Sequence, residues 1–166
     1  MDRLPRVTLL DSTLRDGAQG EGVSFSVTDK ISVVRALDAL GVDIIEAGNP
    51  GSNPKDAEFF REARGLRLAR STLAAFGSTR RRDTRPESDA QLASLLAADT
   101  GIVVLFGKSW TFHVRAVLGV SLEENLAMIG DSVAFLRSAG RRVIFDAEHF
   151  FDGFAADPAY ALACLR

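Results

Sequence analysis

Cysteine is almost absent from this sequence, which holds one, Cys164, among its 166 residues. A single cysteine excludes an internal disulfide bond and a zinc site built from cysteines, and it suits a reducing compartment. Histidine is nearly as rare, because the chain has only His113 and His149. No two histidines lie two residues apart, so the sequence contains no His-x-His metal-binding pair.

Long hydrophobic runs and a surplus of positive charge are missing as well. The longest apolar stretches fall far short of the ~20 residues that a membrane-spanning helix needs, and residues 1–6 lack the hydrophobic core of a signal peptide. The net charge is −2, which provides no basic field for nucleic acid. We therefore expect a cytoplasmic protein that binds neither membranes nor nucleic acids.

The residues that are present are typical of one ordinary globular domain, with 46% hydrophobic and 25% charged residues. Short apolar runs, rich in β-branched and aromatic residues, predict strands at 7–10, 42–46, 73–76, 102–106 and 143–146. Helical patterns separate these runs, with expected starts near Thr28, Pro54, Asp89, Ser121 and Pro158. Strands and helices in alternation imply a parallel sheet whose strands are buried on both faces.

Two parallel architectures fit this order of elements: an open doubly wound sheet and a (β/α)8 TIM barrel. Polar residues follow every predicted strand, and this favours the barrel because an open sheet gathers its functional residues in one crevice. They are Asp11, Arg15, Asp16, Glu46, Asn49, Asn53, Ser78, Thr79, Arg80, Lys108, Ser109, His113, Asp146, Glu148 and His149. A whole barrel takes about 250 residues. We therefore expect residues 1–166 to be the N-terminal portion, about five βα units, of a single barrel catalytic domain.

The most informative motif is the segment 11–19, Asp-Ser-Thr-Leu-Arg-Asp-Gly-Ala-Gln, directly after the first predicted strand. Loops at the ends of parallel strands line the ligand site, so the adjacent Arg15 and Asp16 are candidates for chemistry. A strand-end salt bridge with Gly17 in the turn would also explain them. A second cluster, Arg80–Arg82 with Arg85, fits either a solvated loop or a site for an anionic ligand.

The segment 11–19 resembles the signature of the metal-dependent condensing and lyase barrels, the family of 2-isopropylmalate, homocitrate and citramalate synthases and of hydroxymethylglutaryl-CoA lyase. The resemblance covers the whole chain. Segments 20–26, 49–56, 76–81, 106–110 and 145–153 are most similar to the citramalate synthase branch. The resemblance implies an acyltransferase that joins acetyl-CoA to an α-keto acid in a Claisen-type condensation. In that branch the keto acid is pyruvate and the product is citramalate, in isoleucine biosynthesis.

The same resemblance implies roles for the residues of the motif. Asp16 would be a ligand of a divalent metal, and a carboxylate oxygen suits Mg²⁺, Mn²⁺ or Zn²⁺. Arg15 would be catalytic, stabilising the alkoxide that develops when the acetyl-CoA enolate adds to the keto carbon. Glu46 would also be catalytic by holding the Arg15 guanidinium in place, with a loop or helix-cap acceptor as the alternative. Asp11 is a further candidate for orienting Arg15.

Four other residues are candidates for substrate binding. By resemblance, Thr79 would contact the substrate carboxylate and Gln19 would lie near the metal. His113 could serve as a base or a substrate contact. Alternation along an extended segment places Glu148 on the same face as Asp146 and away from His149, so Glu148 is expected to face the barrel mouth. Loop hydrogen bonding is the alternative for Gln19, and a structural role is the alternative for His113.

The sequence also departs from the family, because the family completes its metal site with a His-x-His pair. A single carboxylate does not hold a divalent ion tightly, so this chain alone is expected to be inactive. The resemblance implies a longer, homodimeric protein that supplies the other ligands and the base. Alternatives are an isopropylmalate or homocitrate synthase, then a hydroxymethylglutaryl-CoA-type lyase, or a non-catalytic half-barrel that binds a partner. An unclosed barrel exposes its first and fifth strands, which predicts aggregation or pairing with another chain.

Overall fold

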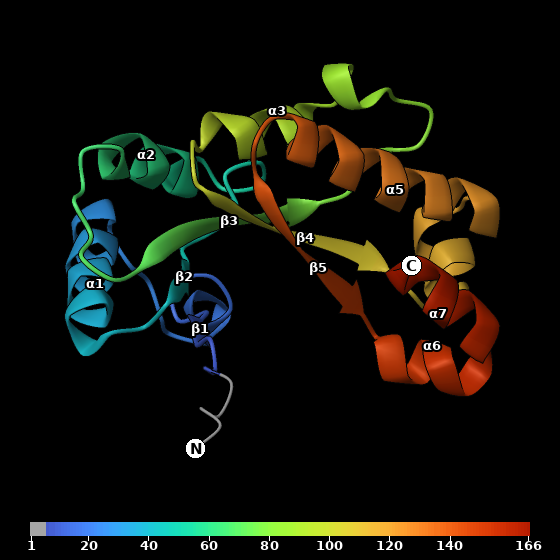
Figure 1. Ribbon diagram of the computed structural model, residues 1–166, viewed down its shortest axis with the longest axis horizontal. Helices are drawn as coiled ribbons and strands as arrows, with labels where there is room; N and C mark the ends of the chain where they lie inside the picture. The colour runs from blue at the N-terminus through green and yellow to red at the C-terminus, as the bar shows by residue number, and fades with distance from the viewer. Residues whose placement is uncertain (1–5) are drawn as a thin grey trace.

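The computed structural model describes residues 6–166, and its centre is a curled sheet of five parallel strands (Figure 1). The order of the strands in the sheet is their order in the chain. They are β1 (Leu10–Asp11), β2 (Ile44–Glu46), β3 (Thr72–Ser78), β4 (Ile102–Lys108) and β5 (Arg142–Glu148). This half-barrel confirms the predicted fold class. Residues 1–5, within the segment that we expect to lack a signal-peptide core, lie outside the described residues.

Helices cover the convex side of the sheet, and the side between β1 and α6 is open (Figure 1). The α-helices are α1 (Val27–Leu40), α2 (Pro54–Ala63), α3 (Ala90–Ala97), α4 (Thr111–His113), α5 (Leu122–Ser138), α6 (Phe150–Ala156) and α7 (Pro158–Leu165). Two short 3₁₀ helices, η1 (Gly17–Gln19) and η2 (Pro86–Ser88), and a π-helix, η3 (Val114–Leu118), lie in the loops. In the described part of the chain, no helix is long and apolar enough to span a bilayer.

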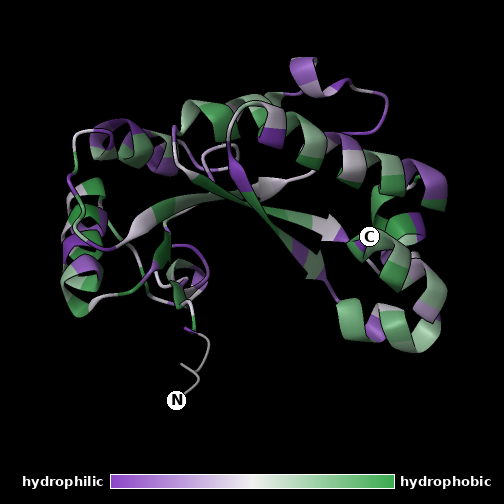
Figure 2. Ribbon diagram, viewed as in Figure 1, coloured by the Kyte–Doolittle hydropathy of each residue, from purple (hydrophilic) through white to green (hydrophobic). Residues whose placement is uncertain are grey.

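The strands carry two apolar layers, because successive side chains point to opposite faces of a sheet. The outer layer, which includes Ile45, Ala75 and Val103, packs against the helices. The inner layer lines the hollow of the half-barrel and consists of Ile44, Ala74, Phe76, Ile102 and Val104. Figure 2 shows hydrophobic strands and a hydrophilic loop between β3 and α3. The inner positions that follow this layer toward the carboxyl ends of the strands are polar, and they form the candidate site.

Local signals explain where most of the helices begin. Asp89 and Ser121 accept hydrogen bonds from the first turns of α3 and α5, and Pro54 opens α2, as predicted. The expected start of α1 at Thr28 is wrong. Ser26 is the N-cap, because its hydroxyl accepts from Asp29 N while the Asp29 carboxylate accepts from Ser26 N. This reciprocal pair begins the helix earlier than Thr28 alone predicts.

The expectation that every strand is buried on both faces is wrong for the two outer strands. The strand predicted at 7–10 is reduced to Leu10–Asp11, and Val7 and Leu9 are 75% and 57% exposed. All of β5 is exposed or half-buried, whereas β3 and β4 are mostly buried. The reason is that, among residues 6–166, β1 pairs only with β2, and β5 only with β4. Each outer strand therefore lacks the neighbour that would cover it.

Several short elements after β4 and β5 have no counterpart in the predicted pattern. The segment from α4 through η3 ends at Gly119, which adopts a left-handed conformation at φ 64°. Helix α6 has His149 as its N-cap residue, which is also left-handed at φ 54°. It packs closely on the end of β4, since a Cβ atom on Gly153 would lie 2.5 Å from the Ser109 carbonyl oxygen. The loops after β4 and β5 are therefore held together at the mouth of the half-barrel.

Candidate active site

Arg15 is positioned by a tight turn after β1. The backbone N–H groups of Arg15, Asp16 and Gly17 all donate to the Ser12 carbonyl oxygen, at 3.1, 2.8 and 3.1 Å. Leu14, which is fully buried, anchors the same turn in the outer apolar layer. With Leu14 turned into the core, the next side chain emerges at the mouth of the half-barrel, where ligands bind in folds of this type.

Two carboxylates and an aromatic ring surround the Arg15 guanidinium. Its Nε donates to Glu46 Oε1 at 2.5 Å, and its Nη1 donates to Asp16 Oδ1 at 2.9 Å. Its carbon lies 3.9 Å from the centre of the Phe76 ring, in a cation–π contact. Among the described residues, none accepts a hydrogen bond from Nη2. The guanidinium is thus fixed at Nε and Nη1, and the N–H groups of Nη2 remain free to donate to a ligand.

Glu46 ends β2 on the inner face of the sheet, where its side chain is almost fully buried. The expected pairing of Glu46 with Arg15 is present. Burial raises the pKa of Glu46 above its ordinary value, and the charges of Asp146 and Asp16 act in the same direction. The hydrogen bond and positive charge of Arg15 oppose this rise. Arg15 is therefore the group that favours the ionised form of this buried carboxylate.

The opposite side of the site comes from β4 and β5. Lys108 Nζ pairs with Glu148 Oε2 at 2.5 Å. Burial raises the pKa of Asp146, and so does the charge of Glu148, while the charges of Arg15 and Lys108 lower it. The charge of Asp16 also acts on both Glu46 and Asp146. The strand ends of β1, β2, β4 and β5 therefore share one electrostatic environment.

A stacked pair of aromatic rings forms the floor beneath these charges. Phe76 of β3 and Phe106 of β4 stack with ring centres 4.9 Å apart. Arg15 lies over Phe76, and Lys108 Nζ lies 5.9 Å from the centre of the Phe106 ring. An apolar floor between two cations suits a small anion with a short apolar group.

The other predicted site residues are distributed over three places. Gln19 lines a pocket of about 270 Å³ together with Arg15. Thr79 is buried after β3, donates its N–H to the Phe106 carbonyl, and lines a different pocket of about 310 Å³. His113 packs edge-to-face on His149, with ring centres 4.5 Å apart, and its Nδ1 is buried without a hydrogen-bond partner.

The proposed orientation of Arg15 by Asp11 is wrong. Both carboxylate oxygens of Asp11 accept hydrogen bonds from Thr13, one from its N–H and one from its hydroxyl, each at 3.0 Å. Because Asp11 closes the turn locally, it is Glu46 and Asp16 that bind the guanidinium. The role of Lys108 as the partner of Glu148 was missed. The period of two along neighbouring strands would have revealed it, since Phe106 and Lys108 share a face, as do Asp146 and Glu148.

The described residues do not form a complete site for a divalent metal. In the segment 6–166, no group of three histidine, cysteine or acidic side chains could hold one. Asp16 is the accessible carboxylate next to Arg15, with its side chain 63% exposed, and Arg15 already occupies one of its oxygens. Asp16 can therefore contribute at most one ligand group to a metal whose other ligands come from elsewhere.

The same residues were compared with known proteins. Residues 6–164 match the family described as HMGL-like. The chain belongs to the HMGL-like family. This HMGL-like chain is 55% identical over 157 residues to the (R)-citramalate synthase of Synechocystis sp. and 51% identical over 160 residues to that of Sulfolobus acidocaldarius. These similarities confirm the resemblance to citramalate synthases that the loop segments indicated.

The matches also show how much of the relatives the HMGL-like chain represents. They include 95% and 96% of this chain but only 29% and 31% of the two synthases. The crystal structure of hydroxymethylglutaryl-CoA lyase from Pseudomonas aeruginosa superimposes with a TM-score of 0.64 and 25% identity. That superposition covers 84% of this chain and 45% of the lyase chain. The HMGL-like chain thus spans less than a third of the curated synthases and under half of the lyase.

Proposed function

We propose that this chain is the N-terminal part, one portion of a single barrel domain, of an enzyme that condenses acetyl-CoA with pyruvate to give citramalate. The observation that carries the proposal is the Arg15 guanidinium, fixed by Glu46 and Asp16 and free at Nη2. The identity of 55% to a citramalate synthase, against 33% to a homocitrate synthase, supports pyruvate as the keto acid. As part of such an enzyme, the chain would act in the cytoplasm on small molecules, in a homodimer.

In this proposal, Arg15 binds the keto oxygen of the substrate through Nη2. Negative charge develops on that oxygen as the new carbon–carbon bond forms, and a guanidinium already held in place stabilises it without reorganisation. Glu46 keeps the Arg15 guanidinium oriented. The Phe76–Phe106 floor would contact the methyl group of pyruvate.

A divalent metal is the implied cofactor, and Asp16 is the residue of this chain that we propose as one of its ligands. Such an ion would supply Lewis-acid polarisation of the keto group. The described residues do not complete its coordination, so the chain alone is expected to be inactive. Thr79, Glu148, Gln19 and His113 remain predictions for substrate contacts.

A chimeric enzyme tests the proposal. Residues 1–166 would replace the matching segment of the Synechocystis synthase, and release of CoA thiol from acetyl-CoA would be followed with a divalent metal and pyruvate. We expect pyruvate-dependent release and citramalate as the product, with the unmodified synthase as the control. Release with a larger α-keto acid but not with pyruvate would overturn the substrate, and cleavage of hydroxymethylglutaryl-CoA without condensation would overturn the reaction.

A further inference from the structure

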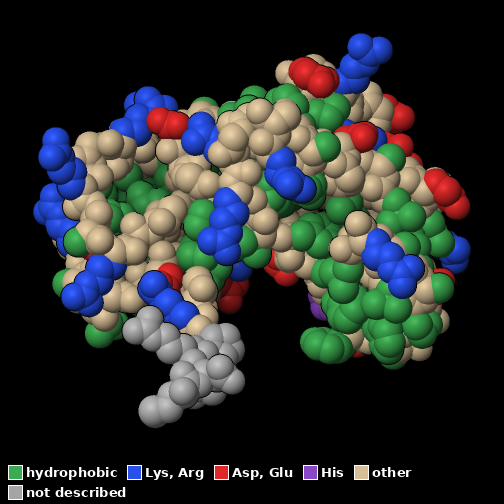
Figure 3. All heavy atoms as spheres, viewed as in Figure 1, with side chains coloured by type: hydrophobic (Ala, Val, Ile, Leu, Met, Phe, Trp, Pro, Cys, Tyr) green, Lys and Arg blue, Asp and Glu red, His purple; other side chains and the backbone are tan. Residues whose placement is uncertain are grey.

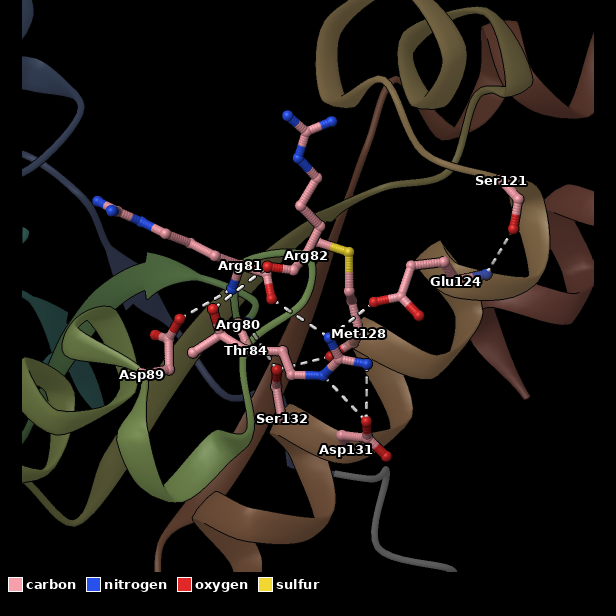
Figure 4. A network of polar contacts seen from close by, with 10 residues as sticks. All are labelled: Arg80, Arg81, Arg82, Thr84, Asp89, Ser121, Glu124, Met128, Asp131 and Ser132. Atoms are coloured by element: carbon pink, nitrogen blue, oxygen red, sulfur yellow. Dashed lines mark hydrogen bonds and ion pairs between the residues drawn. The ribbon is translucent and has the colours of Figure 1, made fainter.

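The three consecutive arginines after β3 have different surroundings (Figure 4). The Arg80 side chain is 7% exposed and pairs with Glu124 at 2.8 Å and with Asp131 at 2.9 Å. Its backbone N–H donates to Ser132 Oγ at 2.8 Å. Arg80 therefore attaches the loop to α5. Its side chain is neither solvated nor available to an anionic ligand, the two interpretations that the sequence offered for this cluster. Arg81 and Arg82 are exposed, and Figure 4 shows their side chains extending away from this network.

Arg81 and Arg82 have no acidic partner for their guanidinium groups among residues 6–166. Arg82 Nη1 donates to the Gly119 carbonyl oxygen at 3.3 Å, and only the backbone N–H of Arg81 contacts a carboxylate, that of Asp89. The loop that carries them is rigid at both ends, because Arg80 is tied to α5 and Asp89 caps α3. Two guanidinium groups that lack acidic partners and are carried on a fixed loop are suited to bidentate binding of phosphate.

These two arginines line a pocket of about 310 Å³ whose opposite wall is apolar. Val117, Leu118 and Val120 form that wall together with Met128 of α5, and no acidic side chain of the described residues lines the pocket. Phe106, the ring that stacks beneath the active site, and Lys108 line the same pocket, so the two sites are adjacent. A ligand with a phosphate at one end and a flat apolar body at the other would contact the arginines with the phosphate and the apolar wall with the body.

We propose that this pocket binds a phosphorylated nucleoside, with its phosphate on Arg81 and Arg82 and its base against the apolar wall. Where the nucleoside is the end group of an acyl-CoA substrate, the proposal rests on the proposed function and adds a subsite to it. Where the nucleotide is free, the pocket is an independent ligand site. The phosphate and the base are common to both.

Calorimetric titration of the chimeric synthase, in which residues 1–166 are part of a complete enzyme, tests the pocket with ADP, 3′-phospho-ADP and inorganic phosphate. In an Arg81→Ala/Arg82→Ala variant, we expect nucleotide affinity to fall about tenfold or more. The matched control is Arg67→Ala/Arg85→Ala, which removes the same charge from residues that do not line the pocket. The control should change affinity less than twofold. An Arg81→Gln/Arg82→Gln variant with an unchanged melting temperature repeats the test if the alanine variant folds poorly.

Three results would overturn the proposal: equal weakening in the control, phosphate binding as tightly as ADP, or no saturable binding of either nucleotide. Tighter binding of 3′-phospho-ADP than of ADP would support the acyl-CoA end group, and equal binding would support a free nucleotide. Nucleotide binding together with an inactive chimera would leave the pocket standing and overturn only the proposed function.

Discussion

Arg15 shows how a residue common in turns becomes a candidate for catalysis. Its Nε and Nη1 are each bound to a different carboxylate, and its flat face rests on Phe76. A lysine at this position would retain the positive charge but not the planar guanidinium. An ammonium group cannot reproduce the two directed contacts and the stacking on an aromatic ring. The geometry of the group therefore matters as much as its charge.

Arg15→Lys in the chimeric synthase should lower kcat about 100-fold or more, with a smaller change in KM, because the lost donor acts on charge that develops during the reaction. The measurement is steady-state release of CoA thiol at varied pyruvate. Arg67→Lys is the matched control, since Arg67 is exposed and forms no hydrogen bond or ion pair to a described residue. An unchanged kcat in Arg15→Lys would remove Arg15 from the mechanism.

Gly48, after β2, is required by the ion pair beside it. Its φ is 145°, and a Cβ atom there would lie 2.5 Å from the Asp56 carboxylate. Asp56 and Lys30 form a buried salt bridge, and Asp56 Oδ2 accepts from Asn49 N at 2.8 Å. Any side chain at position 48 must therefore displace a buried charge.

We expect Gly48→Ala to lower the free energy of unfolding by about 2–4 kcal/mol, from overpacking and a disturbed buried ion pair. Gly130→Ala is the matched control, because Gly130 lies inside α5 with nothing within 4 Å of an added Cβ atom. That substitution should stabilise by about 0.5–1 kcal/mol. Urea unfolding of both variants measures the difference, and similar stabilities would refute the role of Gly48.

At the scale of elements, Asp38 joins α1 to the loop before β3. Its carboxylate accepts hydrogen bonds from the backbone N–H groups of Ala69, Arg70 and Ser71, at 2.9, 2.8 and 2.8 Å. These three donors stabilise the ionised form and lower the pKa of Asp38 from 3.8 to about 2. A lowered pKa means that the contribution of Asp38 to stability is present above its ordinary pKa and is lost as the pH falls through about 2.

Asp38→Asn should therefore melt at a lower temperature than the parent at neutral pH, and the gap should narrow between about pH 4 and about pH 2. Thermal unfolding followed across that range measures the gap. Asp83→Asn is the control, because Asp83 accepts no hydrogen bond from a described residue and asparagine tolerates its left-handed conformation. A gap that stays constant down to pH 2 would contradict the linkage.

The elements differ in how far their sequences predict them. The long apolar runs that became β3 and β4 and the capped helices α2, α3 and α5 were predicted, because local signals and tertiary packing agree there. The site was predicted at Arg15 and Glu46, since both lie at strand ends. The loops after β4 and β5 were not, because η3 and α6 depend on contacts such as that of Gly153 with Ser109. The short β1 shows the same limit, since its extent depends on having only one neighbour.

At the scale of the whole molecule, the half-barrel exposes apolar surface at its ends. Phe151 is 85% exposed on α6 and Leu165 is 51% exposed on α7, and Figure 3 shows a broad hydrophobic surface over these helices. The outer edge of β5 lies next to them, and no strand in the described part of the chain pairs with it. An unpaired edge beside exposed apolar helices is a site of association.

The isolated chain is therefore expected to self-associate or aggregate as its concentration rises, and Phe151→Lys/Leu165→Lys should shift it toward monomer. Sedimentation velocity over a range of concentrations measures this. Leu40→Lys is the control, since Leu40 is 77% exposed at the end of α1, away from β5. A cooperative, monodisperse monomer in the parent chain would refute the expectation.

The order of the strands has a consequence for the way the protein is made. Each strand pairs only with the strands that precede and follow it in the chain. During synthesis, every new strand and helix can therefore dock on the unit that left the ribosome just before it, with no need to wait for a distant partner. The half-barrel grows in one direction, and at every stage its most recently made strand is the edge that receives the next one.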